Sequence, residues 1–488
     1  MGKKGKGKKG KGPQKPVGMS DEMWALSNNI PDLILNTQGK GGSGPLNVSR
    51  GQAAFFLWQL ALSKGAKGWD EIIGGQGVQA AIQAAHYGDY MDKASSMGLV
   101  GKLLQEEAGR ENLLSMRNPQ PIPVLFNCLN TGTPHTVIAA ITAMRTLTEA
   151  PETRKVFVRN VKDWTDIIDI LKEEHGWQAR SEAARCLVLC SQYGSGDKQS
   201  AQYVRLNTGR AGGIQHLVDM CSPDQDWGAA GAVARSQAAF CLLHRLSDEG
   251  NKQAFQAAGG VRALVVVMKD PLVTLEGKAS AAGALYKYMS LTSGFGMDGE
   301  GSVLLHSSQS KLQSMSLAPT EKLPGEVTGN EAVMLKRVQA VADSGAIEYI
   351  VVLCSGPDGP PPKPGDRPAT ASAGGKKKKG KKGKKGKQPP MPPGMPQAHI
   401  YASGCLRQLS YDDNNKAKIV KAEAPRFLAP LLESNIAEAR WHARATLLNM
   451  AMDPQQHSDM HLCGVPQHIL SISSPAIKNL QRPTTAPI

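Results

Sequence analysis

The clearest hydrophobic pattern of the chain lies in residues 236–268, SQAAFCLLHRLSDEGNKQAFQAAGGVRALVVVM. Ala239, Leu242, Leu243 and Leu246 recur at helical spacing, which predicts a long helix with one buried face. The polar run SDEGN breaks this pattern, and a short helical piece, KQAFQAAG, follows it. A glycine pair then opens a further helix, GGVRALVVVM. The predicted order is therefore a long helix, a turn, a short helix, a glycine corner and a medium helix.

The same order of elements recurs along most of the chain. Residues 401–434 match it nearly element for element, and residues 440–470 match it again. Upstream, residues 139–158 and 181–192 supply the long-helix part, and residues 52–82 form a first, looser copy. Recurrence of this kind is typical of solenoids, in which stacked units bury one continuous core. The sequence therefore predicts an all-α repeat protein.

The corners before the medium helices set the length of one unit. Successive corners are 43, 49, 47, 85, 79 and 40 residues apart. Units of about 40–47 residues are typical of armadillo and HEAT repeats, so the two long steps each hold one unit and an insertion. The corners fall at Pro121-Ile122, Trp164-Thr165, Gly213-Ile214, Gly260-Val261, Gly345-Ala346, Ala424-Pro425 and Gly464-Val465.

The two insertions and both chain ends differ in composition from the repeats. Residues 292–331 are polar and glycine-rich, and residues 356–398 place a lysine-glycine block between proline-rich arms. Neither composition can pack a core. We therefore expect a polar insertion at residues 292–331 and a disordered one at residues 356–398. The predicted organisation is a disordered leader (1–19), a helical or loop lead-in (20–50), repeats (51–291), the first insertion (292–331), repeat helices (332–355), the second insertion (356–398), repeats (399–472) and a tail (473–488).

The charge of the chain is concentrated in two short segments. The net charge is +15, and the segments MGKKGKGKKGKGPQK and KKKKGKKGKKGK, at residues 1–15 and 376–387, contain lysines and no acidic residue. We call them the N-terminal and the inner lysine tract. Their lysines account for the whole excess, so the repeats themselves are close to neutral. The inner tract is expected to project from the loop between the second and third helices of one unit.

The eight cysteines are scattered and lie mostly within apolar helical patterns, which favours free thiols in a reducing intracellular compartment. No apolar run approaches the roughly 18 residues that a membrane helix needs, so we expect no transmembrane segment. The beginning of the chain lacks the charged-then-apolar order of a signal peptide. A cytoplasmic location follows as the first expectation.

Motifs that would carry catalysis or bind a cofactor are weak. The inner tract imitates a phosphate-binding loop at Gly375, Gly380 and Lys381, but Lys382 stands where the motif needs serine or threonine. His457, His461 and Cys463 have a spacing that metal ligands can use, although no fourth ligand is nearby and a polar turn explains them equally. We therefore expect a protein that is not an enzyme and that needs no cofactor or metal.

The repeated residues resemble the armadillo-repeat family. The resemblance rests on the corner Gly213-Ile214, on the third-helix segment QAAFCLLHRLSDEGN, and on the asparagines Asn251 and Asn414 that close such helices. It covers residues 50–470 in about seven units and implies a right-handed α-solenoid of three-helix repeats. This fold serves many partners, so the resemblance alone does not give the function.

The resemblance also implies a binding surface on the concave wall that the third helices form. In the family an asparagine near the end of the third helix often lines this groove. The positions that match it here are Gln59, Thr146, Leu189, Arg245, Lys287, Gln408 and Asn449, and we predict all of them except Leu189 to bind a protein partner. One turn earlier the nuclear-import adaptors carry tryptophan, whereas this chain has Phe55, Thr142, Arg185, Cys241, Gly283, Gly404 and Ala445. The binding of nuclear-import signals is therefore not expected.

The lysine tracts are expected to bind polyanions by charge alone, because no aromatic or arginine side chain is interleaved with the lysines. Acidic tubulin tails, nucleic acid without sequence preference, and an anionic membrane surface all meet this requirement. A solubilising role without a partner is an open alternative. The predicted polyanion-binding residues are Lys3, Lys4, Lys6, Lys8, Lys9, Lys11, Lys376, Lys377, Lys378, Lys379, Lys381, Lys382, Lys384, Lys385 and Lys387.

Two functions remain in competition on the sequence. The first is a scaffold whose groove holds a protein while the lysine tracts tether it to an acidic surface such as a microtubule, as in the armadillo proteins of ciliary axonemes. The second is a nuclear or RNA-associated armadillo protein whose inner tract is a localisation signal and a phosphate-binding segment. The sequence names neither the partner nor the organelle.

Overall fold

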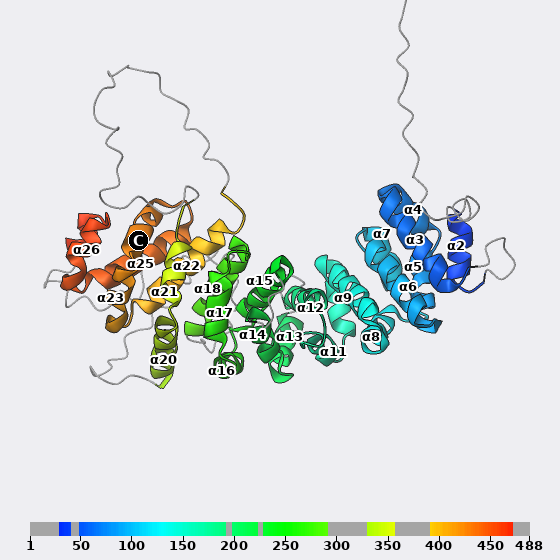
Figure 1. Cartoon of the computed structure of the whole chain (residues 1–488), viewed down its shortest axis with the longest axis horizontal. Helices are drawn as coiled ribbons and strands as arrows, with labels where there is room; N and C mark the ends of the chain where they lie inside the picture. Colours follow the sequence, from blue (N-terminus) through cyan, green and yellow to red (C-terminus); the bar gives the residue numbers. More distant parts are fainter. Residues whose placement is uncertain are drawn as a thin grey trace, which may run out of the picture. The chain divides into compact units, whose positions relative to one another are not determined.

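The computed structural model describes residues 29–40, 48–191, 198–222, 228–290, 329–356 and 391–471. Every element in this part of the chain is a helix, as predicted (Figure 1). The leader, most of both insertions, the tail and all of the lysines predicted to bind polyanions lie outside the described residues. None of the described helices is both long and apolar enough to cross a membrane.

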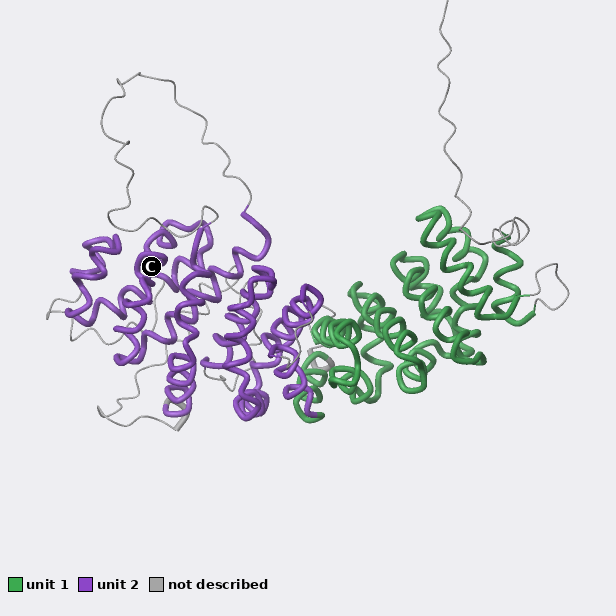
Figure 2. The backbone as a smooth tube through the Cα atoms, viewed as in Figure 1, with its two compact units in different colours: residues 1–211 green, residues 212–488 purple. Residues whose placement is uncertain are grey.

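The chain forms two compact units, residues 1–211 and residues 212–488 (Figure 2). Each unit is an α-solenoid built from the predicted order of a first, a second and a long third helix. The helices of unit 1 are α2 (Ile30–Thr37), α3 (Arg50–Lys64), α4 (Ala66–Gly74), α5 (Gly77–Tyr87), α6 (Tyr90–Leu103), α7 (Glu107–Ser115), α8 (Pro121–Thr131), α9 (Pro134–Glu149), α10 (Pro151–Asn160), α11 (Thr165–Asp169), α12 (Trp177–Cys190) and α13 (Lys198–Arg210).

Unit 2 continues the same order and contains the positions of both insertions. Its helices are α14 (Gly213–Cys221), α15 (Gly228–Arg245), α16 (Glu249–Ala257), α17 (Gly260–Lys269), α18 (Leu275–Met289), α20 (Gly329–Asp343), α21 (Ala346–Val352), α22 (Met395–Leu409), α23 (Asp413–Lys421), α24 (Ala424–Leu428), η3 (Pro430–Glu433), α25 (Ala437–Ala451), η4 (Pro454–Gln456), α26 (His457–Leu462) and α27 (Gln467–Leu470). The inner lysine tract therefore separates a second helix, α21, from a third helix, α22.

The predicted corners coincide with the starts of second helices. Helices α8, α11, α14, α17, α21 and α24 each begin at, or one residue from, a predicted corner. The residue before most of these helices has a left-handed backbone, as at Gly212, Gly259 and Gly345 (φ 78°, 73° and 76°). Glycine adopts this conformation without steric cost, which explains why glycine marks the corners in the sequence.

The described residues contain eight third helices, one more than the seven armadillo-like repeats predicted from the sequence. The additional one is α6, in which the polar residues Ser95 and Ser96 are buried together with apolar residues of the same helix. Its corner is formed by Gln76, a left-handed residue that is not glycine (φ 69°). A left-handed residue that is not glycine also precedes α24, at Glu423 (φ 59°).

Candidate binding surface on the third helices

The third helices of each unit lie side by side. In unit 1 the order is α3, α6, α9 and α12, and in unit 2 it is α15, α18, α22 and α25. Several of these helices begin at a residue whose side chain caps the N-terminus. The hydroxyls of Ser49, Thr133 and Thr274 accept hydrogen bonds from the backbone at the beginning of α3, α9 and α18. The apolar faces of the helices are buried, and a narrow face of each remains accessible.

The six predicted groove positions differ in exposure. Gln59 is exposed and Lys287 is half-buried, whereas the other four are buried, namely Thr146, Arg245, Gln408 and Asn449. Two of the buried side chains are held by internal hydrogen bonds: Thr146 Oγ1 donates to the carbonyl of Thr142 (2.9 Å), and Asn449 Nδ2 donates to Ser410 Oγ (3.0 Å). Because these four side chains serve the interior, the accessible face must lie elsewhere on the same helices. A role of the six positions in binding stays a prediction.

On each of these third helices, the accessible face contains the residue directly before the predicted groove position. All six of these residues are half-buried, and we call them the ladder: Trp58, Arg145, His244, Tyr286, Arg407 and Leu448. Successive side chains of an α-helix point in directions about 100° apart. Two neighbouring residues can therefore be buried and accessible, respectively. Tryptophan, tyrosine and arginine are the residues most enriched at energetically important positions of protein interfaces.

Several ladder side chains extend onto the neighbouring third helix, where a glycine leaves room for them. A Cβ atom at Gly98 of α6 would lie 3.0 Å from Cδ2 of Trp58, which comes from α3. A Cβ atom at Gly404 of α22 would lie 3.1 Å from Cε2 of Tyr286, which comes from α18. The glycines therefore let large ladder residues lie flat between adjacent helices instead of standing away from them.

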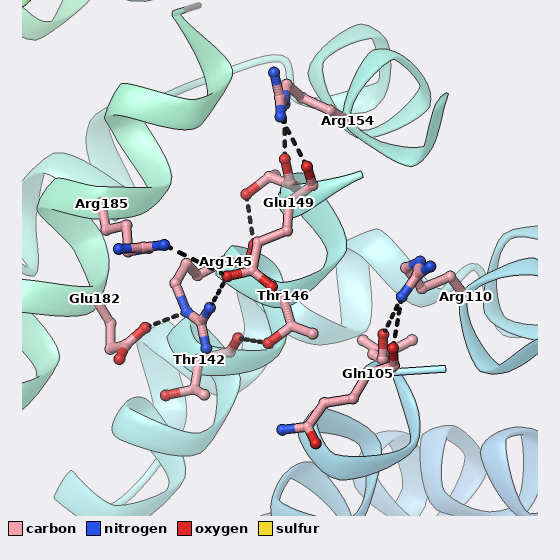
Figure 3. Close-up of polar contacts among 11 residues, drawn as sticks. Gln105, Arg110, Thr142, Arg145, Thr146, Glu149, Arg154, Glu182 and Arg185 are labelled. Atoms are coloured by element: carbon pink, nitrogen blue, oxygen red, sulfur yellow. Dashed lines mark hydrogen bonds and ion pairs between the residues drawn. The ribbon is translucent and has the colours of Figure 1, made fainter. Parts of the chain in front are cut away.

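The ladder of unit 1 is neutralised by ion pairs at Arg145 (Figure 3). Arg145 Nε lies 2.5 Å from Glu182 Oε2 on α12, and the same guanidinium pairs with Glu149 on its own helix. Arg185 Nη2 lies 3.8 Å from Glu149 Oε1. The cluster joins α9 to α12, and it leaves little unbalanced charge on this part of the surface.

Arginines of the first helices close the C-terminal ends of the preceding third helices (Figure 3). Arg110 Nη1 donates to the carbonyls of Leu104 and Gln105, both at 2.9 Å. Arg154 Nε and Nη2 donate to the carbonyls of Thr148 and Glu149 at 2.7 and 2.9 Å. These carbonyls have no partner within their own helix, so the arginines stabilise the helix ends and are structural.

The ladder of unit 2 is aromatic and basic. The guanidinium carbon of Arg407 lies 4.0 Å from the ring centroid of Trp441, and Arg407 Nε donates to the hydroxyl of Tyr411 (3.0 Å). The ring of Tyr286 meets the ring of His442 edge to face, with centroids 5.6 Å apart. These residues come from α18, α22 and α25 and from the turn after α22, so the cluster spans three consecutive third helices.

Burial controls the protonation of this cluster. It raises the pKa of Tyr286 to about 12 and outweighs the opposing effect of the Arg407 charge. Burial also lowers the pKa of His442, although the carboxylate of Glu438, 3.8 Å from its Nε2, acts in the opposite direction. Tyr286 and His442 are therefore both neutral at pH 7, and the guanidinium of Arg407 carries the positive charge of the cluster.

The described residues hold no group of three or more histidine, cysteine or acidic side chains that could bind a metal. His457 Nε2 lies 2.7 Å from the carbonyl oxygen of Ala451, so this ring is engaged in the turn after α25. All eight cysteines are free; seven are buried and Cys463 is partly exposed. A hollow of about 260 Å³ between α11 and α13, lined by residues that include Asp163, Asn207 and Arg210, is polar and shallow.

Comparison with known proteins supports the fold. No protein-family model and no curated protein sequence matches the chain. The chain is similar to the crystal structure of an engineered protein at 16% identity, with a TM-score of 0.51, over 93% of this chain and 99% of that one. A designed armadillo repeat protein has 12% identity, a TM-score of 0.42, and covers 53% of this chain and 99% of its own. A second, in complex with the peptide (KR)4, has 14% identity, a TM-score of 0.41, and covers 53% and 99%.

Proposed function

We propose that this protein is a non-enzymatic scaffold that binds another protein along the ladder of unit 2. The observation that carries the proposal is the stacking of Arg407 on Trp441, because it holds a charged group and an aromatic ring in fixed positions on an accessible face. An ordered arginine–aromatic pair loses little conformational entropy when a partner binds. A neighbouring half-buried leucine, Leu448, adds apolar surface to this face.

Affinity capture from native extract tests this proposal. The full-length chain and its Arg407→Ala variant are used as baits, and the captured proteins are quantified by mass spectrometry. The matched control is Arg262→Ala, because Arg262 is an exposed arginine of the second helix α17. We expect Arg407→Ala to lose one or more partners that Arg262→Ala retains, while circular dichroism shows that both variants are folded. Identical partners for both variants would contradict binding at the ladder.

The lysine tracts provide the second part of the proposed function. They would tether the scaffold to an acidic surface, with the tails of tubulin on cytoplasmic or ciliary microtubules as the leading candidate. The support is their composition, which is dominated by lysine and glycine and contains no acidic residue. Nine lysines in the inner tract would make the attachment strongly dependent on salt.

Deletion of residues 374–387 separates the two functions left open by the sequence. We expect the deletion to abolish co-sedimentation with microtubules and to leave capture of the ladder-dependent partner intact. If microtubule binding persists and nuclear entry is lost instead, the inner tract is a localisation signal. A third result, with neither property changed, assigns the tract a solubilising role.

A further inference from the structure

Arg407 differs from three buried arginines of unit 2, which each have an acidic partner. Arg235 Nη2 lies 2.6 Å from Asp270 Oδ2, Arg426 Nη1 lies 2.5 Å from Glu423 Oε2, and Arg337 pairs with Glu249. Among the described residues, Arg407 donates a hydrogen bond to the Tyr411 hydroxyl and makes cation–π contacts with the rings of Tyr411 and Trp441. Three buried guanidinium groups of the unit are therefore neutralised, whereas Arg407, on the accessible face, has no counter-ion among the residues that the structure describes.

We infer that Arg407 binds a carboxylate side chain of the partner, so that the ladder of unit 2 recognises an acidic segment. This inference rests on the proposed function and adds the chemistry of the ligand. The Nε of Arg407 is occupied by Tyr411, and the ring of Trp441 covers one face of the guanidinium. The Nη groups remain as donors, and a carboxylate matches them because it accepts two parallel hydrogen bonds.

The surroundings of Arg407 favour a peptide carboxylate over a nucleic acid. A polyphosphate backbone is held by several cations in a row, whereas Tyr286 and His442 are neutral neighbours in this cluster. The half-buried side chains of Ile400 and Leu448, on α22 and α25, offer apolar contacts beside the charge. The expected ligand is an extended segment in which acidic residues lie next to apolar ones.

The carboxylate of Glu438 lies next to His442 and does not neutralise the charge of Arg407. Glu438 Oε1 lies 3.8 Å from His442 Nε2 and forms no ion pair with Arg407. Arg444 on α25 is exposed, so the accessible surface of this helix adds a second positive charge. The charge balance of the cluster is therefore positive, which disfavours the approach of a basic segment and favours an acidic one.

Photo-crosslinking with a defined peptide tests the inference. The peptide SGLEELGS, with photo-leucine replacing its second leucine, is irradiated with the full-length chain, and the crosslinked residues are identified by mass spectrometry. A twin with both glutamates changed to glutamine reports on the charge. A second twin with phosphoserine at the same two places distinguishes a carboxylate from a phosphate. Because the lysine tracts also attract acidic peptides, only crosslinks on α18, α22 and α25 are counted.

We expect the glutamate peptide to crosslink to these helices, and we expect Arg407→Gln to reduce the yield about tenfold, the loss typical of one charge-assisted contact. Arg262→Gln should not change it. The glutamine twin should give the reduced yield with the unaltered chain. Equal yields from the glutamate and glutamine peptides, or an Arg407→Gln variant that crosslinks normally while folded, would overturn the inference. A phosphoserine twin that crosslinks alone would assign the site to phosphopeptides instead.

The outcomes for the ligand chemistry and for the proposed function can be told apart. If Arg407→Ala loses a partner from extract and the peptides show no preference for glutamate, the scaffold function stands and the acidic ligand is wrong. If the partners of Arg407→Ala are unchanged, the proposed function fails whatever the peptides show.

Discussion

The guanidinium carbon of Arg407 lies 4.0 Å above the centroid of the Trp441 ring and links the third helices α22 and α25. A cation held over the face of a tryptophan is attracted by the negative charge density of the ring. The pair therefore has two roles in unit 2. It contributes to the packing of adjacent repeats, and it fixes the charged group that we propose to meet the partner.

A double-mutant cycle measures the coupling of this pair. We expect Arg407→Ala and Trp441→Ala to show a coupling free energy of about 0.5–1 kcal/mol in urea-induced unfolding, the range for cation–π pairs that are not fully buried. The pair Arg262→Ala and Trp441→Ala is the control, because Arg262 lies on the second helix α17. Its two effects should be additive, and equal coupling in both cycles would contradict a direct contact.

Two glycine substitutions are expected to change stability in opposite directions. A Cβ atom at Gly283 of α18 would lie 2.9 Å from Cδ2 of Tyr401 and 3.0 Å from Cδ1 of Leu243. Gly283→Ala should therefore destabilise unit 2 by about 1–3 kcal/mol through overpacking, despite the better helix propensity of alanine. A Cβ atom at Gly74 of α4 would meet nothing within 4 Å. Gly74→Ala should be neutral or stabilising by less than about 1 kcal/mol.

Chemical denaturation of both variants shows whether each substitution raises or lowers the free energy of unfolding. The midpoint and the slope of the transition are compared with those of the unaltered chain, followed by circular dichroism. Stabilisation by Gly283→Ala would mean that α18 and α22 are further apart than the structure shows.

His442 makes the stability of unit 2 dependent on pH. Because burial lowers the pKa of this histidine below its ordinary value of 6.5, the unfolded chain takes up a proton at a pH where the folded chain does not. The contribution of His442 to the free energy of unfolding should be constant above about pH 6.5. It should decrease as the pH is lowered below about 6.5. Thermal melts at pH 7.5 and 5.5 should therefore show a smaller difference for His442→Leu than for the unaltered chain.

A second histidine provides the comparison for this experiment. Burial also lowers the pKa of His175, which lies in unit 1. Its contribution is unaffected by His442→Leu and remains in both proteins. If the variant keeps the full pH dependence, His442 does not titrate as the structure indicates.

The thiols should react in two distinct classes. Seven of the eight cysteines are buried, so a reagent in solution does not reach their thiols in the native protein. Burial also raises the pKa of Cys128 to about 11, so its thiolate form is scarce at neutral pH. Cys463 is partly exposed, although burial raises its pKa as well. We expect brief treatment with a maleimide to modify Cys463 alone in the native protein and all eight cysteines after unfolding. Mass spectrometry counts the adducts, and rapid native labelling of Cys186 or Cys190 would contradict the packing of α12.

Much of the repeat organisation can be predicted from the sequence, because the corners have a local cause. Most second helices follow a left-handed residue, and glycine at 212, 259 and 345 marks three of these positions in the sequence. Helix α6 could not be predicted in the same way. It packs between α3 and α9, and contacts on both sides favour small residues such as Gly98 over a regular apolar stripe.

The burial of four of the six predicted groove positions could not be predicted from the sequence, and the role of all six in binding stays a prediction. Arg245 and Asn449 are polar, and polarity in a repeat normally indicates exposure, yet both are buried. Their burial depends on partners from other turns and helices, such as Ser410 for Asn449. A helical pattern does not contain such tertiary contacts, so the ladder became apparent only from the packed third helices.

The carbonyl oxygen of Ser355 and Nε2 of His399 lie 2.9 Å apart, although 44 positions separate them in the chain. The chain thus leaves the solenoid and rejoins it at nearly the same point. Loop-closure entropy grows only with the logarithm of length, so segments of quite different size could be exchanged there without disturbing α21 or α22. The junction between α21 and α22 is therefore a position at which a segment can be lengthened, shortened or replaced while the packing of the solenoid is kept.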